Sequence, residues 1–444
     1  GKGANSVAGN TVLGESALDA SVSGGNNTAI GKQALTALTS GSSNTSVGFD
    51  SLAATTTGAD NIGIGSKSLF TNSTGSNNVA IGVSALRNST GDDNTAIGRS
   101  VMFANTSGTS NVALGKGVLA ANTTASNNTG VGTSALAANT TGDLHTAIGS
   151  NALDANTTGS SNVAIGSLSL TDNTTGSSNV AIGIQALQDN TTASSNTAVG
   201  RDALKLNTTG TFNVAVGANA LDANTTGANN IGIGTSALSN NTTSNFNTAL
   251  GHEALRENTT ASNNTGVGAG ALFANTTGTS NVAVGTFALD ANTTANNNTA
   301  VGHNSLTNNT ASDNTAVGRN SLLNNTSGTN NIAVGRDALE LNTTGVNNVA
   351  VGNFALDAQT TDSNNTAVGY AALSANTQTN NTAVGAEALL VNTTGAQNCA
   401  FGTFALDANT TADHNNAFGY IALGKNTTGT KNNAFGKSAG QEVT

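Results

Sequence analysis

The chain has 444 residues, of which only 9% are charged, and it carries a formal net charge of −10. This acidic chain has neither a basic patch nor a basic stripe, so it is not expected to bind nucleic acid or an anionic membrane surface. No apolar run approaches the roughly 18 residues that span a bilayer, so membrane insertion is not expected either. The single cysteine, Cys399, allows no intramolecular disulfide.

One motif fills almost the whole chain. Residues 1–9 ("GKGANSVAG") are interpreted as a partial leading coil, and the absence of an initiator methionine or signal peptide predicts processing or a longer parent chain. From residue 10 to residue 431 the motif N-[TVI]-A-[IV]-G-x-x-[AS]-L-x-x-N-T-T-G-x-x occurs 25 times, with a step of 17 residues except at three places where the step is 16. In the short repeat that begins at Asn78, the missing residue is placed between Leu86 and Asn88. Residues 432–444 form a truncated copy or the transition to a following domain.

Numbered from the leading Asn, the residues around positions 2 to 4 of the repeat predict a β-strand four or five residues long. Positions 2 and 4 carry β-branched residues such as Val163 and Ile165, which alternate with a small residue at position 3. We expect the side chains at positions 2 and 4 to face the core. Position 3 is Ala, Gly or Ser in every copy except the first. This favours a face against which another backbone packs closely, the alternative being a row in which Ala is merely tolerated.

Position 5 is glycine in every copy, and position 9 is Leu in 24 of the 25 full repeats, with Met102 as the exception. An invariant glycine indicates a backbone demand, either a positive φ at a corner or the close approach of another chain segment. The predicted corner glycines include Gly14, Gly166, Gly302 and Gly436.

Asparagine recurs at positions 1 and 12 of the repeat. Stacked identical Asn side chains can form amide ladders that satisfy backbone groups at corners. The position-12 residues also begin Asn-Thr-Thr triplets, which are formal N-glycosylation acceptors, but we prefer the ladder because an inward Asn cannot carry a glycan. These candidate residues are Asn122, Asn139, Asn156, Asn173, Asn190, Asn207 and Asn224.

The repeat predicts an all-β fold, a β-solenoid or parallel β-roll of about 26 coils of 17 residues. A helical solenoid is excluded because the unit is too short for two helices and shows no 3.6-residue period. With strands about 4.8 Å apart, the coils would stack into an elongated rod on the order of 120 Å long. A single-chain solenoid and an intertwined homotrimer both satisfy the periodicity.

The strings "NVAIG" (residues 162–166) and "NTAVG" (residues 196–200) resemble the repeat of trimeric autotransporter adhesin heads. The fuller phrase NTAVG-x-x-AL-x-x-NTTG resembles the fibre repeats of phage and algal-virus proteins and of related bacterial surface proteins, and the resemblance covers nearly the whole chain. It implies a β-roll in each of three intertwined chains, with positions 2 and 4 in each chain's own core and the small position-3 row where chains meet. The candidate interface residues are Ala164, Ala181, Ala198 and Ala215.

Neither catalysis nor a metal or cofactor is expected. His145 replaces a ladder Asn, while His252 and His303 share position 6 three coils apart, roughly 14 Å, which is too far to share a metal ion. We interpret the histidines as surface substitutions. Asp recurs at position 10, as at Asp154, but at spacings of several coils that are too long for an acid–base pair. Cys399 stands at position 2 and is interpreted as a small buried residue.

These features predict a non-enzymatic structural fibre that forms a long stiff rod or spacer in a viral tail fibre, a surface adhesin or an extracellular filament. Its location would be extracellular, on a cell surface or on a virion. The expected partners are further copies of the chain, as a homotrimer or an end-to-end filament, and a host-surface receptor or glycan. The alternative is an ice- or polysaccharide-binding β-solenoid. Adjacent threonines at positions 13 and 14 favour the fibre, because ice binders of this type present Thr-x-Thr arrays.

Overall fold

The computed structural model describes residues 7–443, and these residues contain short strands and turns but no helix. The chain divides into two compact units, unit 1 (Gly1–Thr226) and unit 2 (Gly227–Thr444). Every copy of the repeat contributes one strand of three residues, at positions 2 to 4. The strand position predicted from the alternation is therefore confirmed, but the strands have three residues instead of the predicted four or five.

The strands of unit 1 are β1 (Thr11–Leu13), β2 (Thr28–Ile30), β3 (Thr45–Val47), β4 (Ile62–Ile64), β5 (Val79–Ile81), β6 (Thr95–Ile97), β7 (Val112–Leu114), β8 (Thr129–Val131), β9 (Thr146–Ile148), β10 (Val163–Ile165), β11 (Val180–Ile182), β12 (Thr197–Val199) and β13 (Val214–Val216). Those of unit 2 are β14 (Ile231–Ile233), β15 (Thr248–Leu250), β16 (Thr265–Val267), β17 (Val282–Val284), β18 (Thr299–Val301), β19 (Thr315–Val317), β20 (Ile332–Val334), β21 (Val349–Val351), β22 (Thr366–Val368), β23 (Thr382–Val384), β24 (Cys399–Phe401), β25 (Asn416–Phe418) and β26 (Asn433–Phe435).

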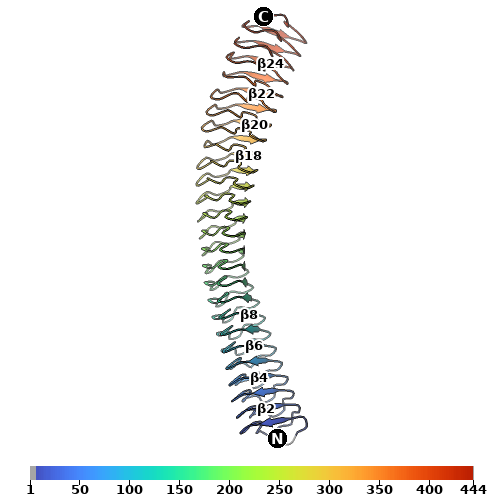
Figure 1. Ribbon diagram of the computed structural model, residues 1–444, viewed down its shortest axis with the longest axis vertical. Helices are drawn as coiled ribbons and strands as arrows, with labels where there is room; N and C mark the ends of the chain where they lie inside the picture. Colours follow the sequence, from blue (N-terminus) through green and yellow to red (C-terminus); the bar gives the residue numbers. More distant parts are fainter. Residues whose placement is uncertain (1–6, 444) are drawn as a thin grey trace. The chain divides into compact units, whose positions relative to one another are not determined.

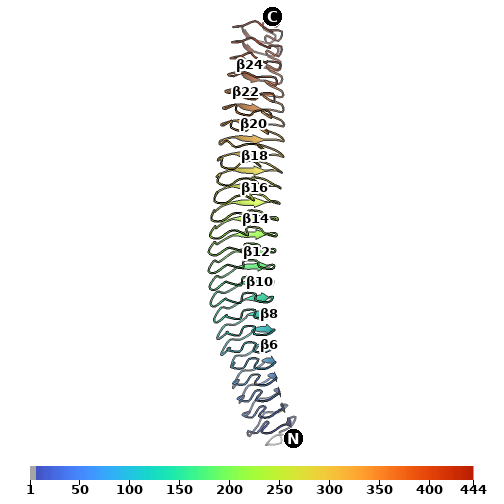
Figure 2. The ribbon, with the colours of Figure 1, turned by 60° about the vertical axis from the view of Figure 1, so that its left-hand side comes forward.

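Within each unit, consecutive strands pair in parallel and in register. In unit 1, for example, Ala164 of β10 pairs with Ala181 of β11, 17 residues later. Figures 1 and 2 show the strands of a unit stacked in chain order, each followed by a loop that returns the chain to the start of the next strand. Each unit is therefore a parallel β-solenoid, as predicted, and every repeat position forms a row of stacked side chains along its unit.

The core of each coil lies between position 3 and positions 8 and 9. Ala164, Ser169 and Leu170 are all fully buried. Gly63 shows what position 3 faces, because a Cβ added there would lie 3.2 Å from Cδ1 of Leu52 in the preceding coil. The strand thus meets the position-9 leucines with a small side chain, and the largest that is fully buried at position 3 is Ser46. The larger Val12, in the first coil, is only half-buried.

The prediction that positions 2 and 4 face the core is wrong. In β10 the burial alternates as half-buried, buried, half-buried, so Val163 and Ile165 lie on the outer face of the sheet while Ala164 points inward. The alternation itself is correct, but its phase is shifted by one residue, and such a shift turns every side chain of a strand to the opposite face.

Glycine is required at the corners both by a positive φ angle and by the close approach of the next coil. The φ angles of Gly14, Gly166, Gly302 and Gly436 are 141°, 133°, 137° and 122°. These values lie outside the left-handed well near +60°, so only glycine adopts them readily. In addition, a Cβ on Gly166 would lie 2.5 Å from the carbonyl oxygen of Gly183 in the next coil.

Other corners place residues with side chains in the left-handed well. Leu168 and Leu170, at positions 7 and 9, have φ angles of 60° and 50°. L residues reach this well at a modest energetic cost. The cost is offset at Leu170, where the backbone N–H donates a hydrogen bond to the carbonyl of Ala186 in the next coil (3.0 Å). No invariant glycine marks these turns, so they were not predicted from the sequence.

The short coil that begins at Asn78 loses its residue in the corner that follows position 12. Ser89 is fully buried and accepts a hydrogen bond from Nδ2 of Asn105, so Ser89 occupies the position-12 row. The placement of the gap between Leu86 and Asn88 is therefore wrong. The corner tolerates the change because it lies outside the strand and the leucine turn, both of which must keep register.

Candidate functional site

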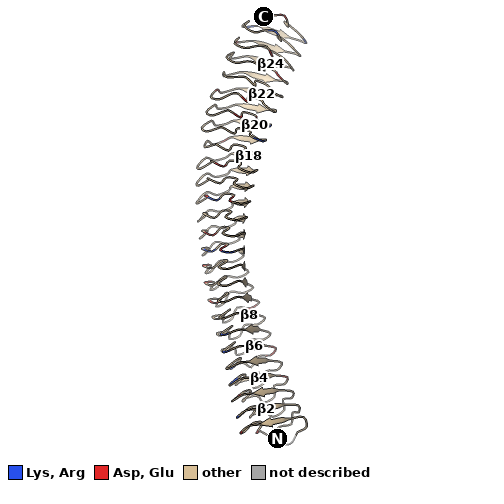
Figure 3. Cartoon of the chain, in the orientation of Figure 1, with Lys and Arg blue, Asp and Glu red and all other residues tan. Residues whose placement is uncertain are grey.

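An apolar stripe runs along the outer face of the sheet in each unit. We call the side chains at positions 2 and 4 of the strands the outer stripe. Position 4 is Leu, Ile, Val or Phe in all 26 strands, and exposed members include Leu114 (45%) and Ile182 (37%). The described strands contain no charged residue, and they appear in the neutral colour in Figure 3.

The outer stripe is large for an exposed surface. A Val or Ile side chain that is one third exposed leaves on the order of 40 Å² of apolar surface in contact with water. In the strands β1–β13 of unit 1, position 4 is apolar throughout, whereas position 2 is Val or Ile in six strands and Thr in seven. The nineteen apolar side chains then expose about 800 Å². The largest apolar patch on a typical monomer is about 300–600 Å², and a standard protein interface buries about 800 Å² on each partner.

In unit 2 the stripe includes a column of aromatic rings. Phe401, Phe418 and Phe435 occupy position 4 of β24 to β26, and successive rings stack with centroids 5.0 Å apart and an interplanar angle of 6°. Asn416 and Asn433 stand beside them at position 2, joined by a 2.8 Å hydrogen bond from Nδ2 of Asn416 to Oδ1 of Asn433. The strands keep their parallel register through this change of residue type.

The small residues at position 3 cannot form a chain interface. Ala164, Ala181, Ala198 and Ala215 have no exposed surface, because each points into the core of its own chain. Their prediction as interface residues is wrong. The tight packing that favours small side chains comes instead from the opposite wall of the same solenoid.

The two asparagine rows point inward and close each coil. Nδ2 of Asn190 donates to Oδ1 of Asn173 in the preceding coil (2.8 Å) and to the carbonyl of Ala193 (3.0 Å). Nδ2 of Asn179, at position 1 of the same coil, donates to that same carbonyl (2.8 Å). Oδ1 of Asn162 accepts the backbone N–H of Asn179 (2.9 Å), which links adjacent coils. Both rows therefore satisfy backbone groups at corners where strand pairing has ended.

All seven candidate position-12 residues are buried members of this ladder: Asn122, Asn139, Asn156, Asn173, Asn190, Asn207 and Asn224. Their amide nitrogens are engaged and shielded from water in the folded chain. The row is interrupted at Gln359, which has a longer side chain. Its Oε1 accepts a hydrogen bond from Nδ2 of Asn365 in the next coil (2.8 Å). Oδ1 of Asn342, in the preceding coil, is left without a hydrogen-bond partner.

The histidines differ in their surroundings. His145 is 1% exposed, so its interpretation as a surface substitution is wrong. Its backbone N–H donates to Oδ1 of Asn128 (2.9 Å), and its Nδ1 accepts the backbone N–H of Asn162 (3.1 Å), which are the contacts of a ladder Asn. His252 and His303 are exposed on separate coils.

The remaining chemical candidates are dispersed. Burial raises the pKa of Asp154, and the nearby charge of Asp172 adds to the shift. Cys399 is half-buried on the outer face, so its interpretation as a buried core residue is wrong, and partial burial raises the pKa of its thiol. Within residues 7–443, no group of three or more His, Cys, Asp or Glu side chains could hold a metal ion.

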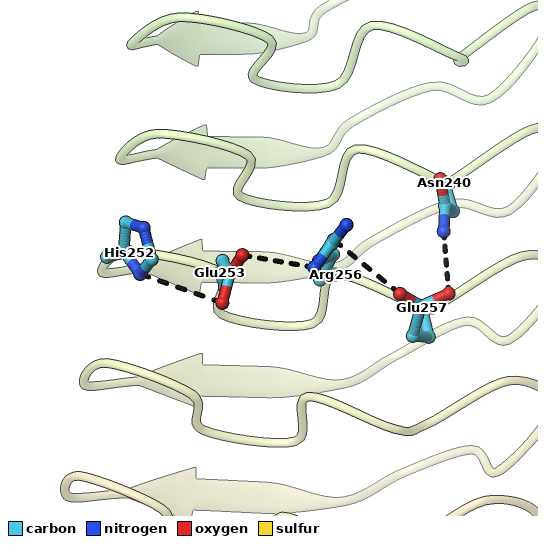
Figure 4. Close-up of polar contacts among 5 residues, drawn as sticks. All are labelled: Asn240, His252, Glu253, Arg256 and Glu257. Atoms are coloured by element: carbon cyan, nitrogen blue, oxygen red, sulfur yellow. Dashed lines mark hydrogen bonds and ion pairs between the residues drawn. The ribbon is translucent and has the colours of Figure 1, made fainter.

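One polar network in unit 2 combines several charged side chains (Figure 4). Nη1 of Arg256 lies 3.0 Å from Oε1 of Glu253, and Nε of Arg256 lies 3.5 Å from Oε1 of Glu257. His252 lies 3.8 Å from the other carboxylate oxygen of Glu253, and Asn240 of the preceding coil donates to Oε2 of Glu257 (2.7 Å). This network borders a groove of about 390 Å³ beside Gly270 and Phe287.

Residues 7–443 include no apolar helix of bilayer-spanning length. No protein-family model matches the chain, and no curated protein matches it either.

Proposed function

We propose that the chain is a non-enzymatic structural fibre whose copies associate side by side through the outer stripe. The observation that carries this proposal is the outer stripe itself, in which position 4 is apolar in every strand although it faces outward. An exposed apolar surface of this size in a regular array marks an interaction surface. A second copy of the chain offers an equally long and equally uncharged stripe, so the two surfaces match in length and chemistry.

The regular stack of coils suits a protein that acts as a long, stiff spacer. Each coil bonds to its neighbours through the parallel strands, the asparagine rows and the closely approaching corner glycines. In such solenoids the stability accumulates from nearest-neighbour contacts, so adding coils extends the structure without a new core. We infer a long spacer in a viral tail fibre, a surface adhesin or an extracellular filament, with location outside the cell or on a virion.

Contact with a host-surface receptor or glycan would use the positions that vary from coil to coil. Positions 6, 7, 10 and 16 carry different residues in successive coils, whereas positions 1, 3, 5, 9 and 12 are committed to the fold. The homotrimer is the association state that we favour for the fibre.

The alternative of an ice- or polysaccharide-binding solenoid draws no support from the threonine corner. Oγ1 of Thr174, at position 13, donates to the carbonyl of Thr191 in the next coil (3.0 Å), and the same bond recurs along the row. These hydroxyl groups are used within the chain, which leaves fewer of them for a ligand.

Native mass spectrometry of the intact chain tests the proposal. For the wild type we expect a species near three times 43.3 kDa. The double variant Ile165→Glu/Ile182→Glu places two charges in the outer stripe and is expected to shift the population to the single-chain mass. The charges point outward, so circular dichroism should remain that of the wild type.

The matched control is Thr158→Glu/Thr175→Glu, which places the same charges at exposed position 14 of two consecutive coils. This control should keep the mass of the wild-type assembly. A wild type that stays at 43.3 kDa at every concentration tested would overturn the proposal. So would a stripe variant that assembles as well as the control.

A further inference from the structure

We infer that the groove beside Gly270 in unit 2 is a binding site for an alkylammonium group, such as that of a free amine or a lysine side chain. The groove has a volume of about 390 Å³ and is lined by Glu253, Gly270, Phe273, Phe287 and Asp290 among others. This volume lies within the range of small-ligand sites, about 300–1,000 Å³. The inference goes beyond the proposed fibre function and does not depend on it.

The groove lies where one coil of unit 2 lacks a side chain at position 7. Gly270 has φ 64°, an angle that other position-7 residues such as Asn304 (56°) adopt with a side chain present. A Cβ on Gly270 would lie 2.8 Å from Cδ1 of Phe287, so the Phe287 ring leans over the glycine and forms one wall. Phe287 remains 47% exposed, which leaves apolar ring surface available to a ligand.

The charge in the groove is negative and uncompensated. Arg256 is shared between Glu253 and Glu257 and also stacks on the ring of Phe273, with its guanidinium carbon 5.6 Å from the ring centroid. Figure 4 shows the two glutamates on either side of that arginine. Asp290 is half-buried, and among the described residues no hydrogen bond or cation is found for its carboxylate. Burial alone raises its pKa.

Asp290 points toward the hollow. Its Oδ1 lies 3.8 Å from the place where a Cβ on Gly270 would stand. A carboxylate that is partly desolvated and has no partner gains most from a cation that brings its own carbon chain, because the chain can pack on Phe287 while the charge pairs with the carboxylate. A neutral or anionic ligand would leave the carboxylate uncompensated.

A comparable hollow in unit 1 is also lined by an aspartate and a phenylalanine. It has a volume of about 320 Å³ and is lined by Asp50, Ala53 and Phe70 among others. Lys67 and Arg87 both lie over the ring of Phe70, each 5.7 Å from the centroid. In the unit 2 groove Arg256 lies over Phe273 in the same way. Within residues 7–443, no lysine or arginine stacks on Phe287, so that half-exposed ring is open to the cation of a ligand.

Isothermal titration calorimetry of the full chain with n-butylammonium chloride tests the inference, with n-butanol as the neutral isostere. We expect saturable binding of the amine, binding of the alcohol at least tenfold weaker, and weaker amine binding as the salt concentration rises. Asp290→Asn should weaken amine binding at least tenfold, and Gly270→Asn should abolish it by filling the hollow. Asp222→Asn, a change at position 10 of unit 1, should leave it unchanged.

Gly270→Asn should fold, because position 7 accepts Asn in the left-handed well at Asn304 and Asn320 and the exposed Phe287 ring can move away from the added side chain. Circular dichroism of both groove variants checks the fold. An acetylated and amidated Gly-Lys-Gly peptide provides a second arm. Binding of both ligands supports a site open to lysine side chains, and binding of the amine alone supports a site for free amines. The inference is overturned if neither binds, if the alcohol binds as tightly as the amine, or if Asp290→Asn binds like the wild type.

Discussion

The backbone N–H of Asn162 donates a hydrogen bond to Nδ1 of His145, which lies one coil earlier and 3.1 Å away. Nε2 of the same ring is 2.7 Å from the carbonyl oxygen of Gly159. A carbonyl only accepts, so the proton lies on Nε2 and the ring is neutral. Burial lowers the pKa of His145 below its ordinary value of 6.5. The imidazole thus replaces a ladder asparagine and keeps both of its contacts.

This geometry predicts a pH-dependent stability that one substitution removes. Because the pKa of the folded state is lowered, the contribution of the neutral ring is fully present above about pH 6.5 and is lost as the pH falls below that value. Protonation of Nδ1 breaks the bond to Asn162, at a cost of about 1–3 kcal/mol. Chemical denaturation between pH 5 and 8 should show this loss in the wild type and not in His145→Asn. Equal pH profiles would contradict the assignment.

The half-buried aspartates predict the opposite dependence of stability on pH, in a lower pH range than that of His145. Burial raises the pKa of Asp222 above its ordinary value of 3.8. The folded state therefore binds the proton more tightly than the unfolded chain, and stability falls as the pH rises through that range. Asp222→Asn should stabilise the chain at pH 7 by less than about 1 kcal/mol, since solvent screens much of the effect. The gain should be smaller at pH 4, and a gain that is equal at both pH values would show that desolvation of this carboxylate is not its cause.

Replacement of a corner glycine by alanine should lower the free energy of unfolding most where another coil follows. Gly302 and Gly436 share a positive φ (137° and 122°), but a Cβ on Gly302 would clash with the carbonyl oxygen of Gly318, while a Cβ on Gly436 meets nothing within 4 Å. Gly436→Ala is expected to cost about 1–3 kcal/mol from backbone strain alone. Gly302→Ala should cost clearly more, as measured by denaturant unfolding. Equal losses would mean that strain rather than coil contact fixes this glycine.

Removal of one ladder amide should break hydrogen bonds to both the preceding and the following coil. Asn190 donates to Asn173 and Ala193 and accepts from Asn207 (3.0 Å), all within buried surroundings. Asn190→Ala leaves these groups unpaired and should lower the free energy of unfolding by about 2–4 kcal/mol. Thr192→Ala, an exposed change two residues later, should alter it by less than about 0.5 kcal/mol. If the two variants are equally stable, the ladder contributes little.

Deletion of one whole coil should be tolerated. Removing residues 162–178 joins Ser161 directly to Asn179 and keeps every row in register, because each coil contacts its neighbours in the same way. The melting temperature, followed by circular dichroism, should change by only a few degrees. A deletion of residues 162–169 should instead abolish the cooperative transition, because the strand and the leucine turn would no longer align. A folded product from the second deletion would contradict the repeat boundaries.

Much of the fold follows from the sequence because the repeat states the same constraint many times. The period places one strand in each coil, the invariant glycine marks the corner, and the leucine and asparagine rows are the buried rows that the structure contains. Each of these is a requirement that recurs in every coil, so the repetition of one residue type at one position reveals it. The left-handed turns at Leu168 and Leu170 left no such mark, because many residue types reach that well.

Only the tertiary structure decided which face of the strand is inside. A pleated strand has two possible phases, and large β-branched residues beside small ones would ordinarily place the large ones in the core. Here the opposite wall approaches so closely that the fully buried residues at position 3 are Ala, Gly or Ser, while Val163 and Ile165 turn outward. The same inversion moves the candidate functional surface from the alanine row to the outer stripe. The distance between the two walls is set by the way the whole coil closes, which no single stretch of the sequence encodes.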